Sequence, residues 1–146
     1  MIRAVRKDDL CRLAEIIVFN NRINYYPIFQ DIEYSFGEYN VLSVMEMFEK
    51  DKIFTSSTSV YEDRVIKGFI TVNDGEIRKL YVDSFFQNQQ IGQTLLDAFP
   101  DAFHVWALQK NTRAISFYQR NGFIPDGKTV LEEGTDEYLI HLVRHQ

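Results

Sequence analysis

A polar segment, residues 83–90, connects a strand-like run that ends at Val82 with a helix-like run that begins near Ile91. A loop that passes directly from a strand into a helix exposes unpaired backbone N–H groups at the positive end of the helix dipole. These donors can bind a phosphate or pyrophosphate without any particular side chain. Because no Lys or Arg occurs from Asp83 through Gln109, such a ligand would rest on backbone amides and glutamine side chains.

A second segment, Gly122–Thr129, matches the phosphate-binding pattern Gly-x4-Gly-Lys-Thr. A P-loop follows a strand and opens a helix, whereas this segment follows a helical pattern and leads into a short, β-like run at residues 130–134. Only seventeen residues remain after Thr129, too few for a magnesium-binding strand and the rest of a nucleotide fold. We therefore interpret Gly122 as a helix-terminating glycine and Asp126-Gly127 as a turn, and predict no NTPase.

The histidine and cysteine residues do not predict a metal site. His141 and His145 are four residues apart, and on a strand that spacing separates them by about 13 Å, too far to share a metal ion. The single cysteine, Cys11, is interpreted as a small apolar residue of a helix, and alone it forms no intramolecular disulfide. We expect no metal and a reducing compartment.

The chain has 45% hydrophobic and 25% charged residues, a composition typical of globular proteins. Its length predicts a single domain over residues 1–146. A net charge of −5 disfavours nucleic acid and anionic membranes as partners. An acidic cluster near the carboxyl end is interpreted as a solvated hairpin rather than a docking site for a cationic acceptor: Glu132, Glu133, Asp136 and Glu137. No run is apolar enough for a signal peptide or a membrane span, so we expect a soluble, cytoplasmic protein.

The elements that position the polar loop follow from hydrophobic periodicity. The first half predicts a strand at residues 2–5, a helix capped by Asp8, no assignment over residues 20–36, and a helix at residues 41–50. The middle predicts an antiparallel meander of strands 53–60, 65–72 and 76–82, with a tight turn at 73–75. The remainder predicts a helix at 91–99, a strand at 103–108, a helix before Gly122 and a closing strand at 137–143. This order indicates an α/β protein with a mixed sheet and helices on both faces.

Two sequence motifs, one in the polar loop and one after it, resemble those of a known family. Leu80-Tyr81-Val82, then Gln87-Asn88-Gln89-Gln90-Ile91-Gly92, then Leu95-Leu96 resembles the Gln/Arg-x-x-Gly-x-Gly/Ala signature for acetyl-CoA in the GNAT family of N-acetyltransferases. Nineteen residues past Gly92, the segment Asn111–Phe123 is similar to the family's second motif, Asn, Ala, Tyr, then Gly-Phe. The resemblance is specific over residues 76–123 and silent over residues 20–51, where the family usually builds its acceptor site. Gln90 stands where the family has its first motif glycine.

The resemblance implies the GNAT acyl-CoA N-acyltransferase fold, a central, mostly antiparallel sheet with a parallel pair splayed at the cofactor site. It also implies acetyl-CoA as co-substrate. The residues that would bind it match the two motifs: Leu80, Tyr81, Val82, Gln87, Asn88, Gln89, Gln90, Ile91, Gly92, Gln93, Asn111 and Tyr118.

Catalytic roles follow from the same resemblance. The outward backbone of residues 78–82 would pair with the pantetheine arm, a backbone N–H near Leu80 would hold the oxyanion, and Tyr118 would donate a proton to the coenzyme sulfur. For the general base, some relatives have a glutamate where this chain has Trp106, and histone-type relatives have one that matches Glu76. His104, an imidazole on the flanking strand, is the second candidate, and a relay through water is the third.

The sequence therefore predicts an N-acetyltransferase that moves an acetyl group from acetyl-CoA to a primary amine by direct attack in a ternary complex. The alternative is a non-catalytic GNAT-fold module that binds an acyl-CoA or a protein partner, and a third hypothesis is transfer of a longer acyl chain. The acceptor stays open among small amines, peptides and proteins. A homodimer is possible.

Overall fold

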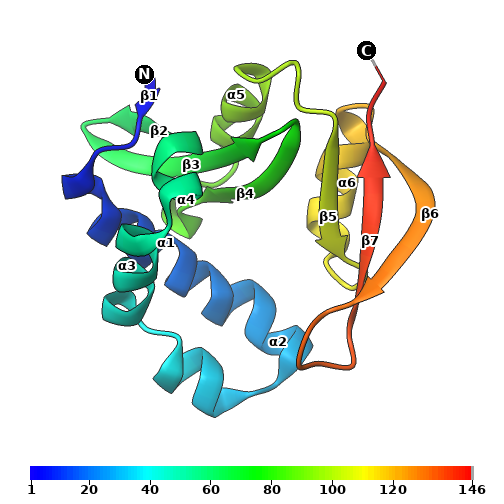
Figure 1. The fold of residues 1–146 in the computed structure, drawn as a ribbon, viewed down its shortest axis with the longest axis horizontal. Coiled ribbons are helices and arrows are strands. Elements are labelled where there is room, and N and C mark those ends of the chain that lie inside the picture. The colour runs from blue at the N-terminus through cyan, green and yellow to red at the C-terminus, as the bar shows by residue number, and fades with distance from the viewer. Residues whose placement is uncertain (146) are drawn as a thin grey trace.

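The computed structural model, which describes residues 1–145, contains one seven-stranded sheet with the strand order β1-β2-β3-β4-β5-β7-β6 (Figure 1). The strands are β1 Ile2–Ala4, β2 Thr58–Asp63, β3 Val65–Asn73, β4 Glu76–Val82, β5 His104–Leu108, β6 Ile124–Leu131 and β7 Tyr138–Val143. The α-helices are α1 Leu10–Asn20, α2 Tyr26–Phe29, α3 Val41–Lys50, α4 Lys52–Ser57, α5 Ile91–Asp97 and α6 Thr112–Arg120. Short 3-10 or π-helical turns are η1 Lys7–Asp9, η2 Asn21–Tyr25, η3 Tyr34–Glu38 and η4 Ser84–Phe86.

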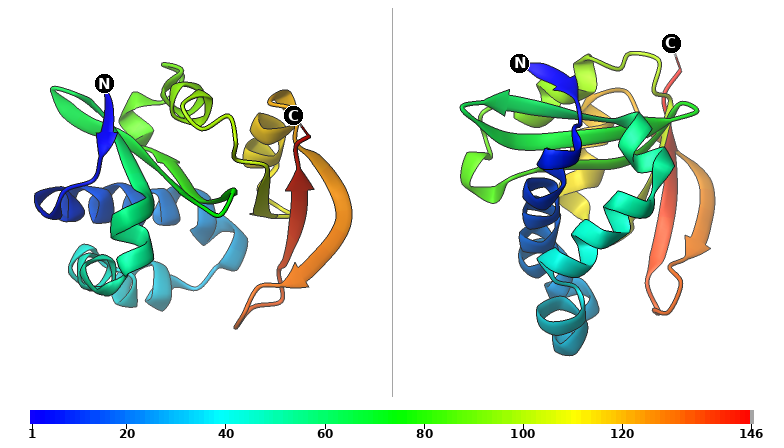
Figure 2. Two further views of the ribbon diagram at one scale, coloured as in Figure 1. Left: turned by 45° about the horizontal axis from the view of Figure 1, so that its top comes forward. Right: turned by 60° about the vertical axis from the view of Figure 1, so that its left-hand side comes forward.

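The centre of the sheet contains its one parallel pair among the described residues. β4 pairs with β5 only through Glu76 with His104 and Ile77 with Val105, and beyond these residues the two strands diverge (Figure 2). A bulge in β4, where Ile77 pairs with Val72 and Lys79 with Thr71, leaves Arg78 as the extra residue at the point of divergence. A bulge increases the local twist, which accounts for the separation of β4 from β5. The expected mixed sheet with a splayed parallel pair is confirmed.

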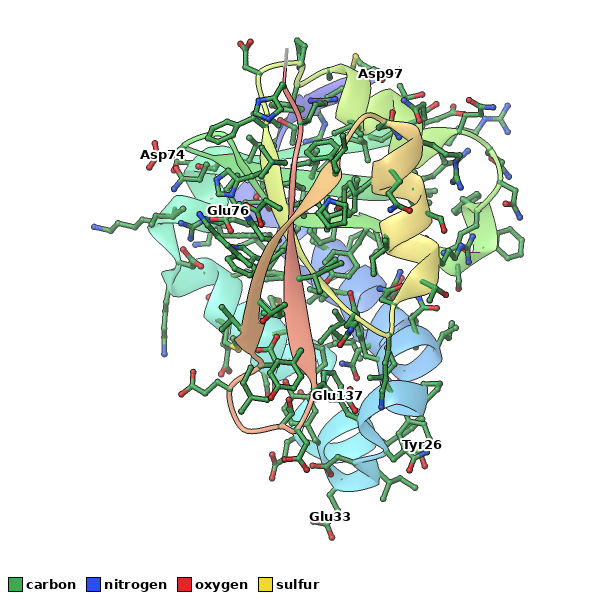
Figure 3. The ribbon with its side chains drawn as sticks, turned by 90° about the vertical axis from the view of Figure 1, so that its right-hand side faces the viewer. Tyr26, Glu33, Asp74, Glu76, Asp97 and Glu137 are labelled. Carbon is green, nitrogen blue, oxygen red and sulfur yellow. The ribbon has the colours of Figure 1, made fainter. Side chains whose placement is uncertain are left out.

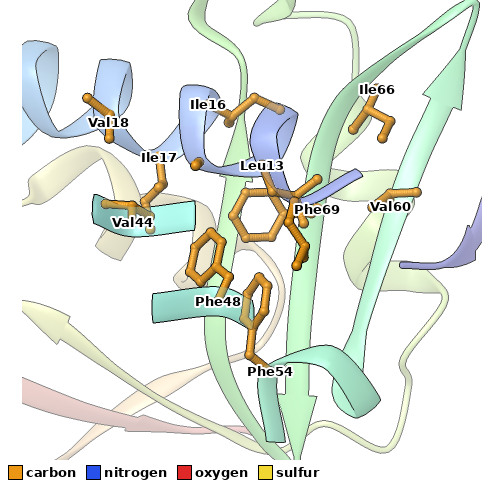
Figure 4. Close-up of a cluster of buried hydrophobic side chains, with 12 residues drawn as sticks. Leu13, Ile16, Ile17, Val18, Val44, Phe48, Phe54, Val60, Ile66 and Phe69 are labelled. Carbon is orange, nitrogen blue, oxygen red and sulfur yellow. The ribbon is translucent and has the colours of Figure 1, made fainter. Parts of the chain in front are cut away.

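Two hydrophobic clusters cover opposite faces of the sheet. One joins α1, α3 and α4 to β2 and β3, and Leu13, Val44 and Phe69 lie at its centre (Figure 4). The other joins α5 and α6 to the middle strands, and includes Ile77 and Val105. Because side chains alternate along a strand, Glu76 and His104 face away from this second cluster, on the side of the sheet that carries α1.

Residues 53–57 correct one prediction: they form α4, and the strand begins at Thr58. The carboxylate of Asp51 accepts the N–H of Phe54 at 3.0 Å, a helix cap. The ring of Phe54 then stacks on Phe48 at 4.0 Å between centroids and meets Phe69 edge-on at 6.1 Å. Capping and tertiary packing override the β propensity of Ile53 and Thr55.

Other boundaries also differ from expectation. Asp8 is not the cap of the first helix; the carboxylate of Asp9 accepts the N–H of Arg6 at 2.7 Å and pairs with Arg3 at 2.7 Å. The segment after Gly122 is the strand β6, and Asp126-Gly127 lies in an irregularity of that strand rather than in a connecting turn. No helix within residues 1–145 is long and apolar enough to cross a membrane.

Candidate active site

A cavity of about 1280 Å³ lies where β4 and β5 diverge. Its walls come from both strands, the loop into α5, one face of α6, the helical segment η2 to α2, and the loop between β6 and β7. The paired start of the two strands closes the cavity at one end. Residues far apart in the sequence therefore share one space.

The predicted cofactor-binding residues converge on this cavity. All of them except Gln89 line it: Leu80, Tyr81, Val82, Gln87, Asn88, Gln90, Ile91, Gly92, Gln93, Asn111 and Tyr118. Glu76 and His104 are not among the lining residues of the described chain; they lie side by side at the closed end, where β4 and β5 still pair. The structure thus brings together the two motifs, and places both candidate bases at one end of the space between the strands.

Contacts from α1 hold the end of β4 and the start of the polar loop. The side-chain amide of Asn20 donates to the carbonyl of Val82 at 3.1 Å, and the guanidinium of Arg12 pairs with the carboxylate of Asp83 at 2.7 Å. Asp83 also accepts the N–H of Phe85 at 2.8 Å. The loop that follows is therefore fixed at its beginning by side chains of a distant helix.

The first turn of α5, which follows the polar loop, has backbone N–H groups at the wall of the cavity. The first hydrogen bond of this helix end runs from Thr94 N–H to the carbonyl of Gln90 at 2.9 Å, so the N–H groups of Ile91, Gly92 and Gln93 have no helical acceptor. These three residues line the cavity. The arrangement is suited to binding an anionic group such as a pyrophosphate.

Gln90 adopts a left-handed backbone conformation, with φ of +65°, and Asn88 does the same at +63°. The left-handed region places Cβ close to a backbone oxygen, at a cost of about 1–2 kcal/mol for an ordinary residue. Gln90 stands where the resembled motif has glycine, and the backbone keeps the conformation that glycine would adopt freely. The loop has retained its shape and bears strain at this residue.

We expect Gln90→Gly to stabilise the protein by about 1 kcal/mol, because glycine relieves the left-handed strain. For a chain of this size that corresponds to a melting temperature higher by about 2–4 °C, measured by thermal unfolding. Gln89→Gly is the matched control, since Gln89 has no positive φ, and its main effect is entropic destabilisation. A lower melting temperature for Gln90→Gly would contradict the assignment of strain to this position.

Tyr118 projects from α6 into the second hydrophobic cluster and lines the cavity. It is 7% exposed, and its ring meets those of Phe117 and Phe123. Asn111 caps the start of α6 by accepting the N–H of Ala114 at 3.2 Å. Burial raises the pKa of the Tyr118 hydroxyl, so this phenol stays protonated at neutral pH and is available as a proton donor.

Tyr25 is a cavity residue outside both motifs; from the sequence, the aromatic residues between Tyr25 and Phe36 fit a pocket lining and ordinary packing equally well. It lies in η2, within the segment left unassigned, and its hydroxyl interacts with the side chains of Tyr81 on β4 and Asn111 before α6. Burial raises the pKa of both Tyr25 and Tyr81. The segment therefore crosses from one diverging strand to the other side of the cavity. No periodic pattern marks it, and its clustered aromatic residues were the one available signal.

Charges are separated within the cavity. Arg113 and Arg120 of α6 lie in the wall shared with the second motif, and can supply the positive charge that the polar loop lacks. Acidic residues gather at the loop between β6 and β7: Glu132, Glu133, Asp136 and Glu137. Figure 3 shows Glu137 at this loop, well separated from Glu76 along the strands. Glu137 pairs with Lys110 at 2.9 Å.

The candidate bases have different partners. Glu76 pairs with the guanidinium of Arg78 at 3.4 Å. His104 shares a hydrogen bond with His141 of β7, with 3.0 Å between His104 Nδ1 and His141 Nε2. Sequence spacing related His141 only to His145, so its contact with His104 was missed; it arises from the pairing of β5 with β7.

Comparisons with known proteins agree with this architecture. Residues 54–125 match the family model described as Acetyltransferase (GNAT) domain. The fold is similar to that of an N-acetyltransferase from Staphylococcus aureus Mu50, with a TM-score of 0.76 and 16% identity, covering 98% of this chain and 99% of that chain. A second structure of similar fold is that of a PaiA N-acetyltransferase from Thermoplasma acidophilum in complex with coenzyme A. It has a TM-score of 0.66 and 19% identity, and the match covers 97% of this chain and 96% of that chain.

A third structure, Naa20 from Chaetomium thermophilum in complex with a bisubstrate analogue, gives a TM-score of 0.62 and 17% identity, covering 99% of this chain and 85% of that chain. The comparison with curated proteins finds no match. The matched residues include β4, the polar loop, β5 and the whole of α6, which contribute walls of the cavity. The chain therefore belongs to the GNAT family of acetyltransferases.

Proposed function

We propose that this protein transfers an acetyl group from acetyl-CoA to a primary amine of a small molecule, peptide or protein by direct attack in a ternary complex. The observation that carries the proposal is the convergence of both family motifs on one cavity between β4 and β5. Structures of similar fold have been solved with coenzyme A and with a bisubstrate analogue, which supports a site for two ligands.

Each requirement of acyl transfer has a candidate group in or beside the cavity. Beyond Ile77 the edge of β4 no longer pairs with β5, so its backbone groups are free to pair with the pantetheine arm, and an N–H near Leu80 would bind the oxyanion. The N–H groups of residues 91–93 would hold the pyrophosphate. Tyr118 would protonate the departing thiolate, and Glu76, His104 or water would accept the proton of the amine.

Calorimetric titration of acetyl-CoA into the protein, beside a titration with ATP and magnesium, tests the cofactor assignment. We expect binding of acetyl-CoA alone. Gly92→Asp should abolish that binding, because it sets a carboxylate among the pyrophosphate donors, while a Cβ at Gly92 meets its nearest neighbour at an ordinary 3.7 Å. Gly37→Asp introduces the same charge where a Cβ has nothing within 4 Å, and should bind as the parent does.

A panel of amines, assayed by release of the coenzyme thiol, then tests catalysis. Turnover with at least one primary amine is the expected result. Binding of acetyl-CoA without turnover on any amine would favour a non-catalytic acyl-CoA-binding module. Binding of neither ligand, or equal binding by Gly92→Asp, would contradict the proposed site.

A further inference from the structure

We propose that His104 is the general base, that His141 positions it and takes up its proton, and that Asp126 on the outer strand β6 stabilises the charge on His141. This inference rests on the proposed acetyl transfer and selects among its candidate bases. Three residues from three strands of the sheet make the relay: His104 on β5, His141 on β7 and Asp126 on β6.

Two hydrogen bonds connect the relay. Nδ1 of His104 lies 3.0 Å from Nε2 of His141, and Nδ1 of His141 lies 2.6 Å from a carboxylate oxygen of Asp126. His141 is 9% exposed and is clamped between aromatic groups, with its ring centroid 4.6 Å from that of Trp106 and 5.1 Å from that of His104. A buried imidazole bonded at both nitrogens is held in one orientation.

The direction of each hydrogen bond follows from the chemistry of the end group. A carboxylate only accepts, so His141 donates through its Nδ1–H to Asp126. A neutral His141 then has a lone pair on Nε2, and His104 must donate its own Nδ1–H to it. The remaining nitrogen of His104, Nε2, is left with a free lone pair. The relay therefore selects the tautomer in which His104 is a base at its outer nitrogen.

Position along the sheet places this base beside the proposed reaction. His104 pairs with Glu76 at the closed end of the cavity, and Trp106, two residues further on the same face of β5, lines that cavity. Two residues of a strand span about 6.6 Å, a separation that a water molecule can bridge between His104 and an acceptor amine beside Trp106. Glu76, by contrast, is already paired with Arg78.

Charged groups around the relay act on it from two strands. Glu76 and Arg78 of β4 lie beside His104, and Asp126 is accompanied on β6 by Lys128, whose backbone N–H donates to its carboxylate at 3.0 Å. The hydrogen bond from His141, and then that from Lys128, lower the pKa of Asp126. Asp126 is therefore ionised at neutral pH, as an acceptor at the end of the relay must be.

The proton balance of the reaction is complete with these groups. The amine nitrogen forms a bond to the acetyl carbon and the bond from that carbon to sulfur breaks. The amine proton passes to His104 Nε2, and the Nδ1 proton of His104 passes to His141, whose imidazolium is paired with Asp126. The thiolate takes the proton of Tyr118, which is then restored from water as the relay releases its proton.

Nuclear magnetic resonance of the histidine rings tests the relay without activity. At a pH where the imidazoles are neutral, we expect His104 and His141 both to carry their proton on Nδ1, and Asp126→Asn to disturb both signals. His145→Gln, at the exposed third histidine, is the control and should leave them unchanged. A proton on Nε2 of His104 in the parent protein would overturn the proposal, even if no acceptor amine had been found.

Kinetics with an accepted amine give the second readout. His104→Gln should lower kcat/KM by about 100-fold, and His141→Gln and Asp126→Asn by about 10-fold. Asp126→Glu keeps a carboxylate at the end of the relay and should restore most of the activity that Asp126→Asn loses. Full activity of His104→Gln or of Asp126→Asn would overturn the relay, and absence of turnover on every amine would count against the proposed function itself.

Discussion

Tyr118→Phe is expected to lower kcat for acetyl transfer by about 100-fold while leaving the KM for acetyl-CoA unchanged. The change removes one oxygen and keeps the ring that packs against Phe117 and Phe123. In the proposed mechanism the phenol acts only when negative charge develops on the departing sulfur, so its loss should affect the transition state and not the bound substrate. Steady-state thiol release at saturating amine measures the effect.

The environment of Tyr118 defines how the result should depend on pH. Burial, followed by the nearby Tyr25, raises the pKa of the hydroxyl, so the phenol does not ionise in the neutral range and the effect of the substitution should not vary with pH there. Tyr138→Phe is the control, because Tyr138 is 49% exposed on β7. Equal turnover of the Tyr118 and Tyr138 variants would remove Tyr118 from the mechanism, and an increased KM for acetyl-CoA alone would assign it to binding.

The parts of the fold that the sequence predicted are those fixed by local signals. The tight turn at Asp74-Gly75 has both residues at positive φ, and the strands on either side pair as expected. The helix over residues 41–50 is confirmed at both ends, with Asn40 as its cap. In each case one short segment contains both the periodicity and the residue that ends it.

The parts that failed depend on contacts between distant segments. Residues 53–57 have β propensity, and become helical because Asp51 caps them and Phe54 is drawn into the cluster of Phe48 and Phe69. The segment of residues 21–38 likewise lacks a periodic pattern. Three of its aromatic residues line the cavity, and the rings of the other two meet one another: Tyr25, Phe29 and Tyr34, then Tyr26 and Phe36. Local propensity does not contain this information.

The candidate site shows the same division. The spacing of residues matched the two family motifs in the loop from Gln87 to Gly92 and in the segment that begins at Asn111. Residues of both segments line the cavity. His104 contacts His141, and His141 contacts Asp126, although the members of each pair are 15 or more positions apart. These contacts depend on register in the sheet, which spacing in the sequence does not reveal. Tyr25 likewise reaches Tyr81 from a distant segment.

Phe69→Ala is expected to destabilise the protein by about 3–5 kcal/mol, the range for an aromatic side chain removed from a core. Phe69 is 0% exposed at the centre of β3 and meets Phe54 and Tyr81 with its ring. Phe69 also pairs with Tyr81 across β3 and β4. The void left by the substitution would therefore remove a packing partner from Tyr81, which lines the candidate site. Urea unfolding should show a lower midpoint with an unchanged slope.

Phe85→Ala is the control for Phe69→Ala, because it removes the same phenyl ring from an exposed position. Phe85 is 83% exposed and, among the rings of the described chain, meets only Phe86, edge-on, so its removal should change stability by no more than about 0.5 kcal/mol. Since a domain of this kind is stable by about 5–15 kcal/mol, the Phe69 variant retains a small margin and the Phe85 variant nearly all of it. Similar midpoints for the two variants would show that β3 does not support the wall of the active site through this ring.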